Sequence, residues 1–187
     1  SGPEGPGVGV PCQTPGVSYP PAPWVLEPMA KPMDYPGDIH GRRMSETPMR
    51  SIIETFEISS GRAREVLSVE GRIEAPNWAP SGDWLLVNGE GRLYRVPLDS
   101  PNLVRIDTGP ATRCNNDHGL TPDGATVILS SHHEGAGSQI YLMPVDGGPL
   151  RKVSPAAPSW WHGVSPDGRT LAYVAARGER RAIDVYT

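Results

Sequence analysis

After residue 49, apolar and polar residues alternate in short runs that are separated by turn-forming residues. The run Ser51–Ile58, for example, alternates and is rich in β-branched residues. Alternation with a period of two puts every second side chain on the same face of an extended segment, so it predicts half-buried β-strands. We expect strands at 51–58, 63–69, 74–79, 84–88, 92–97, 103–107, 114–120, 126–131, 139–144, 150–153, 160–164, 170–175 and 182–186.

One turn recurs three times between these runs. Its prolines, Pro80, Pro122 and Pro166, are 42 and 44 residues apart. Each follows Ala, Thr or Ser and precedes Ser-Gly or Asp-Gly. In such a turn proline pre-sets φ, Ser or Asp bonds back to the backbone, and glycine accepts a positive φ. A period in the forties with several short strands per unit is typical of a β-propeller.

The predicted fold class is therefore all-β, a β-propeller of four-stranded antiparallel blades. About three and a half blades can be counted, since an outer hairpin precedes two complete blades and a third blade with three strands. Propellers have at least about four blades, so we expect an incomplete ring. Either the chain is an N-terminal portion of a larger propeller that is truncated on its C-terminal side, or it is half of an oligomeric ring.

The repeats also resemble a known family. The segments Thr121–Ile128 and Ser165–Ala172 are similar to the repeat of TolB-type proteins, and Gln139–Gly148 is similar to the outer hairpin of that family. The resemblance covers about residues 49–187. It implies a WD-like propeller and, because TolB itself is periplasmic, a periplasmic location. It implies no particular activity, since propellers carry many unrelated functions.

Residues 1–48 differ sharply in composition from the rest of the chain. They contain eleven prolines and seven glycines, without the period of a strand or a helix. Such a segment cannot bury enough apolar surface to form a core. We expect a disordered leader at 1–48 and propeller blades at 49–187. The alternative for the leader is a proline-rich ligand, or an arm that packs on the blades through Trp24.

The charge and the cysteine content of the chain limit the classes of function that it could have. The formal net charge is −4 and no basic patch stands out, so we expect no nucleic-acid partner. Cys12 and Cys114 do not form a CxxC pair. There is no apolar run of about 18 residues and no signal-peptide pattern. From these features alone we expect no membrane partner and a cytoplasmic location.

Four of the five histidines fall where neighbouring strands of a blade would meet. His118 and His162 precede their turn prolines by four residues, near the start of an innermost strand. His132 and His133 end the next strand of the blade that contains His118. Antiparallel neighbours put the start of one strand beside the end of the next, so we expect one cluster at the channel face. The predicted ligand-binding residues are Asn115, Asn116, Asp117, His118, His132, His133, Trp160, Trp161 and His162.

Three interpretations of this cluster stay open. Imidazoles with a carboxylate suit a divalent transition metal, for which His118, His132 and His162 are the candidate ligands. A polar pocket with two tryptophans suits a sugar or a peptide. In the third interpretation the side chains only satisfy backbone groups in the turns. No cofactor is predicted apart from the candidate metal ion.

Other reactive side chains have structural explanations. Asp123 and Asp167 are expected to bond the amides of their own turns. Ser130 and Ser131 lack the GxSxG motif of a hydrolase nucleophile. Cys114 is expected to be a small buried hydrophobic residue.

Two functions compete. The first is a binding module that presents its polar, His-rich channel face to a protein or to a small polar ligand, a carbohydrate or a peptide. The alternative is a metal-dependent lyase or hydrolase of oligosaccharides or peptides. Open blade edges at the first hairpin and at residues 183–186 also predict self-association.

Overall fold

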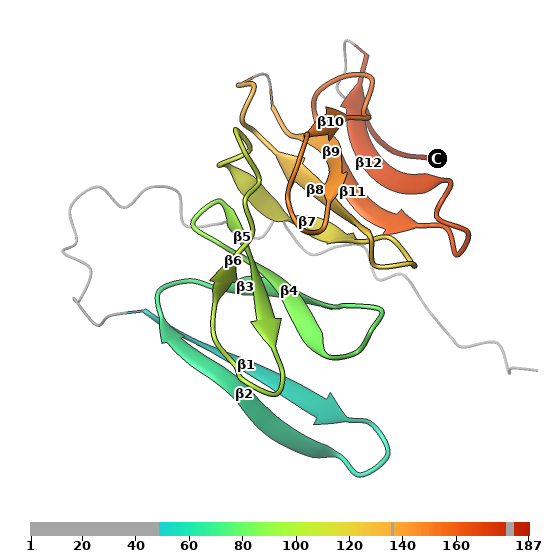
Figure 1. Ribbon diagram of the computed structural model, residues 1–187. Helices are drawn as coiled ribbons and strands as arrows, with labels where there is room; N and C mark the ends of the chain where they lie inside the picture. The colour runs from blue at the N-terminus through green and yellow to red at the C-terminus, as the bar shows by residue number, and fades with distance from the viewer. Residues whose placement is uncertain (1–48, 136, 179–181) are drawn as a thin grey trace, which may run out of the picture. The chain divides into compact units, whose positions relative to one another are not determined.

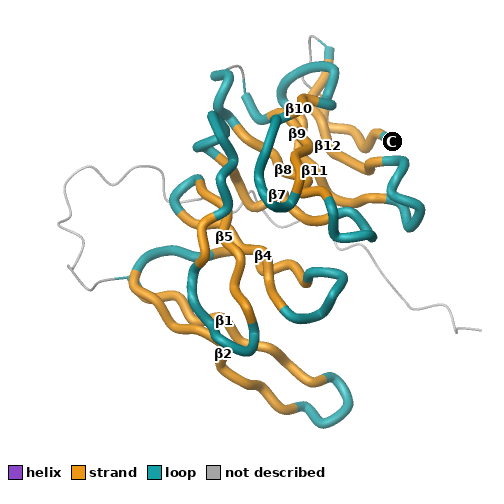
Figure 2. Tube along the Cα trace, in the orientation of Figure 1, coloured by secondary structure: helices purple, strands orange, loops and turns teal. Residues whose placement is uncertain are grey.

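The computed structural model describes residues 49–135, 137–178 and 182–187. All regular structure in these residues is β-strand (Figure 2). None of the described residues forms a helix of the length and hydropathy that membrane crossing requires. The predicted leader at 1–48 lies outside the described residues.

Four antiparallel sheets follow one another along the chain (Figure 1). The hairpin consists of β1 (Arg50–Glu57) and β2 (Arg62–Glu70). Blade I consists of β3 (Glu74–Trp78), β4 (Trp84–Gly89), β5 (Arg92–Pro97) and β6 (Val104–Arg105). Blade II consists of β7 (Cys114–Leu120), β8 (Thr126–Ser131), β9 (Gln139–Pro144) and β10 (Arg151–Lys152). Blade III consists of β11 (Ser159–Val164), β12 (Leu171–Arg177) and β13 (Ala182–Tyr186).

This architecture confirms the predicted all-β fold with four-stranded antiparallel blades. In blades I and II the strands pair in chain order, from the innermost strand to the outermost. Among the described residues no strand pairing joins the hairpin to blade III, so the ring is not closed. The outermost strands β6 and β10 contain two residues each, fewer than the alternation predicts.

The three proline turns have one hydrogen-bond pattern. In each turn the glycine amide donates to the carbonyl oxygen three residues earlier, at a distance of 2.8 Å; the glycines are Gly82, Gly124 and Gly168. All three glycines have φ between 71° and 79°, a conformation that glycine adopts without steric cost. The carboxylates of Asp123 and Asp167 accept from the amides two residues later, at 3.0 and 3.1 Å. The structural role predicted for these two aspartates is confirmed.

The hydrophobic core lies between the sheets. Strand β4 is buried along its whole length, because its alternate side chains enter the layers on its two sides. The layer between the hairpin and blade I contains Ile53, Leu85, Val87 and Val96. The layer between blades I and II contains Ala79, Trp84, Leu86, Leu93, Ile106, Ala111, Cys114, Leu120, Val127, Leu129, Tyr141 and Met143. The layer between blades II and III contains Ile128, Ile140 and Trp161.

Candidate functional site

In each of the three blades a bulge interrupts the pairing of the innermost strand with the next strand. The pairing of β3 with β4 shifts between Glu74 and Asn77. That of β7 with β8 shifts between Cys114 and His118, and that of β11 with β12 shifts around His162. A bulge leaves residues without a ladder partner and changes the direction of their side chains. Three separate strands thus present irregular, polar segments.

These bulges line one pocket of about 280 Å³. We call it the inner-strand pocket. Strand β7 contributes a carboxylate, an amide and an imidazole to it, and β11 contributes an indole and a second imidazole. The residues that line the pocket are Ala75, Pro76, Asn77, Asn116, Asp117, His118, Trp161 and His162.

Asp117 is half-buried in this pocket. Its amide donates to Asn115 Oδ1 at 3.1 Å, which stabilises the bulge. Burial raises the pKa of the Asp117 carboxyl, while the nearby imidazoles of His162 and His132 act in the opposite direction. The carboxylate accepts no hydrogen bond from any described residue in this structure.

His118 is the buried member of the pocket, with 1% of its surface exposed. Its Nδ1 lies 3.2 Å from the carbonyl oxygen of Asn115, and the carbonyls of Leu86 and Ala75 face the ring from blade I. Burial lowers the pKa of His118, which favours the neutral ring. The buried Nε2 has no hydrogen-bond partner among the described residues.

The other predicted residues of the cluster divide between the pocket and the blade interfaces. His162 is exposed at the pocket, and Trp160 is partly buried outside the lining. Trp161 is 9% exposed and belongs to the core between blades II and III. Its amide donates to Ser130 Oγ at 3.0 Å. Trp161 therefore joins two blades as well as lining the pocket.

Asn115 and Asn116 have mainly structural contacts. Asn115 Nδ2 donates to Ser138 Oγ at 3.2 Å. Asn116 Oδ1 accepts from Asn88 Nδ2 at 2.8 Å, across blades I and II. Asn88 is buried on β4, so this bond ties the bulge of β7 to the neighbouring blade.

His133 does not join the pocket. Its ring packs against Tyr141, with 4.7 Å between the ring centroids, and Nε2 lies 3.9 Å from Glu134 Oε1. His132, in contrast, is close enough to influence Asp117 electrostatically. Both histidines follow the end of β8 at Ser131, and His133 lies in the turn after it, so the two side chains are not held on one face of a strand.

The metal interpretation gains no support from this arrangement. No three His, Cys, Asp or Glu side chains of the described residues lie close enough together to hold a metal ion. The Cys114 thiol is also a poor nucleophile, because the residue is 7% exposed and burial raises the pKa of the thiol to about 11.

Part of the pocket is formed by residues that the repeat did not predict. Ala75 and Asn77 line it, although nothing in the repeat marks them. Ala75 has φ of 49°, which is uncommon for a residue other than glycine. A proline after an alanine at the start of a predicted strand was the available signal, since proline in a strand often accompanies a bulge.

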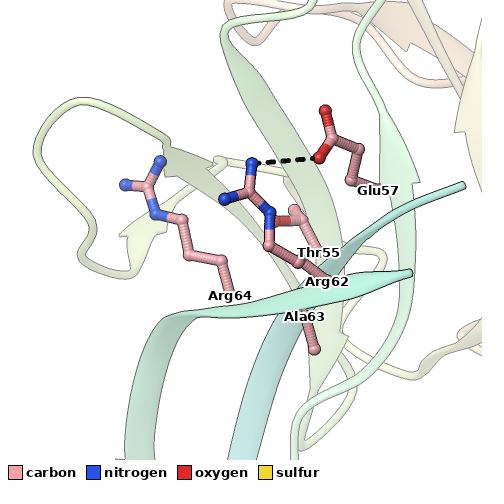
Figure 3. A pocket seen from close by; sticks show the side chains of 5 residues that line it. All are labelled: Thr55, Glu57, Arg62, Ala63 and Arg64. Carbon is pink, nitrogen blue, oxygen red and sulfur yellow. Dashed lines mark hydrogen bonds and ion pairs between the residues drawn. The ribbon is translucent and has the colours of Figure 1, made fainter. Parts of the chain in front are cut away.

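A second hollow, of about 400 Å³, lies on the β1–β2 hairpin. Figure 3 shows Arg62 pointing to Glu57, and the two side chains pair at 3.4 Å. These side chains are 81% and 53% exposed, so water screens the pair. None of the residues that line this hollow is buried: Thr55, Glu57, Arg62, Ala63 and Arg64.

Comparison with known proteins identifies relatives. No model of a known protein family matches the chain. An uncharacterised protein of Agrobacterium fabrum is 45% identical over 149 residues, which are 78% of this chain and 50% of that protein. A solved structure assigned to TolB from Agrobacterium tumefaciens is 44% identical, with a TM-score of 0.71, and the match covers 75% of this chain and 50% of that one.

A further solved structure, TolB from Acinetobacter baumannii, is 24% identical with a TM-score of 0.58, over 72% of this chain and 34% of that one. At this identity the match shows the fold alone. The chain spans about half the length of the Agrobacterium relatives. The repeated turns, the successive blades and these matches agree: the described part of the chain is a TolB-like β-propeller.

Proposed function

We propose that this TolB-like propeller is a binding module, and that its inner-strand pocket takes a small polar ligand or an exposed polar segment of a protein. The observation that carries this proposal is the convergence of three bulged strands on one pocket. Bulges are common beside functional sites because they redirect side chains out of the regular ladder. Concave sites with a few converging polar groups are the usual form of a ligand site.

The pocket combines buried side chains with accessible ones, which supports a binding function. His118 and Trp161 are buried and link blades, so they form a rigid wall. Asp117 is half-buried and His162 is exposed, so both are accessible to a ligand. Rigid walls reduce the ordering cost of binding.

The metal-dependent lyase or hydrolase is the less supported alternative. Its three candidate ligands have unequal environments, since His118 is buried and His162 is exposed. Zinc addition to the purified chain provides its direct test. Stoichiometric zinc binding that is lost in the double variant His118→Ala, His162→Ala would favour the alternative.

A ligand screen tests the binding proposal. We would titrate a panel of short peptides and neutral oligosaccharides into the 187-residue chain and follow the indole signals of its tryptophans by NMR. A binder should shift the Trp161 signal, and His162→Ala should weaken its binding by about tenfold, the effect of losing one good polar contact.

The control for this variant is its stability. Because His162 is exposed, its replacement should leave the urea midpoint of unfolding unchanged. Asn102→Ala, an exposed change outside the pocket, should leave both binding and stability unchanged. The proposal fails if no panel member shifts Trp161, or if His162→Ala and Asn102→Ala bind equally well.

A further inference from the structure

The charge of the inner-strand pocket comes from an acidic side chain. Its lining contains the carboxylate of Asp117 and neither lysine nor arginine. The buried His118 is held in its neutral form by the cost of burying a charge. The imidazoles of His162 and His132 lie near Asp117. Among the residues that line the pocket Asp117 is thus the one carboxylate, and no lysine or arginine balances its charge.

Asp117 is also short of hydrogen-bond donors. No described residue donates to its carboxylate, although the residue is half-buried. A carboxylate that is partly withdrawn from water gains most from a charged donor, because charge-assisted hydrogen bonds are about twice as strong as neutral ones. An incoming cation with N–H groups would supply what the protein does not.

Backbone carbonyl groups lie in the wall behind Asp117. Those of Ala75 and Leu86 face the buried imidazole of His118. Their oxygens add partial negative charge to the wall without a second formal charge. Trp161 adds an aromatic ring to the lining, and aromatic rings attract cations.

From these features we propose that the inner-strand pocket selects a primary ammonium group, as found at a peptide N-terminus or on a lysine side chain. An ammonium group has three donors and one positive charge, which match one carboxylate and its neighbouring acceptors. A calcium ion prefers about six to eight oxygen ligands, more than this lining offers. This inference rests on the proposed binding function and specifies its ligand class.

The test compares two peptides that differ only in the charge of their N-terminus. One is tetra-alanine amide with a free N-terminus, and the other is the same peptide with an acetylated N-terminus. Both are titrated at pH 7 into the full chain, with the Trp161 indole signal as the readout. The free peptide should bind at least about tenfold more tightly, as expected for one charge-assisted hydrogen bond.

Two variants locate the selectivity. Asp117→Asn keeps the shape of the side chain and should abolish the preference for the free peptide. Asp99→Asn makes the same change at an exposed residue outside the pocket and should retain it. If Asp117→Asn fails to fold, the two peptides on the wild-type chain still decide the question.

The outcomes separate this inference from the binding function. If both peptides shift Trp161 equally, or if only oligosaccharides shift it, the ammonium inference is overturned and the binding function stands. If no peptide and no oligosaccharide binds, both are overturned. Binding of zinc or calcium at Asp117 without peptide binding also overturns the ammonium inference.

Discussion

His118 and His162 occupy the same position of the repeat, but their surroundings differ. His118 is 1% exposed between two blades, whereas His162 lies exposed in the bulge of β11. The bulge of β7 ends before His118, which pairs with Leu129 in the regular ladder. The local pairing, and not the repeat position, decides which imidazole is buried.

The burial of His118 predicts a pH dependence of stability. Its pKa is lowered in the folded chain, while in the unfolded chain it should be near about 6.5. Between these two values the unfolded state binds more protons, so the free energy of unfolding decreases as the pH falls below about 6.5. Urea unfolding between about pH 7 and pH 5 measures this slope.

Two variants assign the slope to its residue. His118→Gln removes the titrating group and should give a flatter dependence than the wild type. His162→Gln alters an exposed imidazole and should keep the wild-type slope. Equal slopes in all three proteins would mean that His118 is not the group responsible.

At the scale of elements, neighbouring innermost strands need close contact. Gly119 of β7 lies against the indole of Trp161 on β11, and a Cβ built at Gly119 would lie 2.3 Å from Trp161 Cη2. Glycine is required here by the approach of the ring, and not by backbone conformation. The contact holds blades II and III together beside the pocket.

Gly119→Ala should therefore destabilise the fold. The added methyl group must displace a ring that lies in the core, and overpacking of this kind costs about 1–3 kcal/mol. Gly163 provides the matched control, because it occupies the same repeat position and its built Cβ lies 3.9 Å from Ala172 Cβ. Gly163→Ala should change the urea midpoint much less, and equal losses of stability would contradict this account.

At the scale of the whole molecule, each sheet stabilises the next. Apolar layers fill the spaces from the hairpin to blade III. Strand β13 is the outer edge of the blade III sheet among the described residues, and its Ile183 and Val185 are 68% and 75% exposed. An open apolar edge of this kind favours pairing with another chain.

We therefore predict that the 187-residue chain self-associates. Light scattering during size-exclusion chromatography should show a mass above that of the monomer, which is 20.1 kDa. Val185→Lys should shift the population toward the monomer, because a charged side chain opposes edge pairing. Ser100→Lys adds the same charge at an exposed turn position and should leave the mass unchanged. A wild-type chain that is monomeric at all concentrations would contradict the prediction.

The strands and turns follow from local signals in the sequence. The bounds of the central strands β4, β8 and β9 were predicted closely, although these strands are largely buried on both faces and not half-buried. Strands of this kind contain continuous apolar runs, such as those at 84–87 and 127–129, instead of an alternation. The Pro-Asp-Gly turns could be read from residue chemistry alone. Repetition of these signals at a nearly constant spacing identified the propeller, since each unit folds in the same way and packs on the next.

The tertiary structure decided the composition of the pocket. Bulges depend on pairing between strands, so the sequence of one strand reveals few of them: Pro76 is a signal in β3, whereas β7 and β11 contain no proline. The bulges bring Asp117 and His162 to the same pocket as Ala75 and Asn77. His133, in the turn after β8, packs against Tyr141 instead. Periodicity determines which segments become strands, because it acts along the chain. The pairing of strands and the packing of blades determine which side chains meet, because both depend on contacts between residues far apart in sequence.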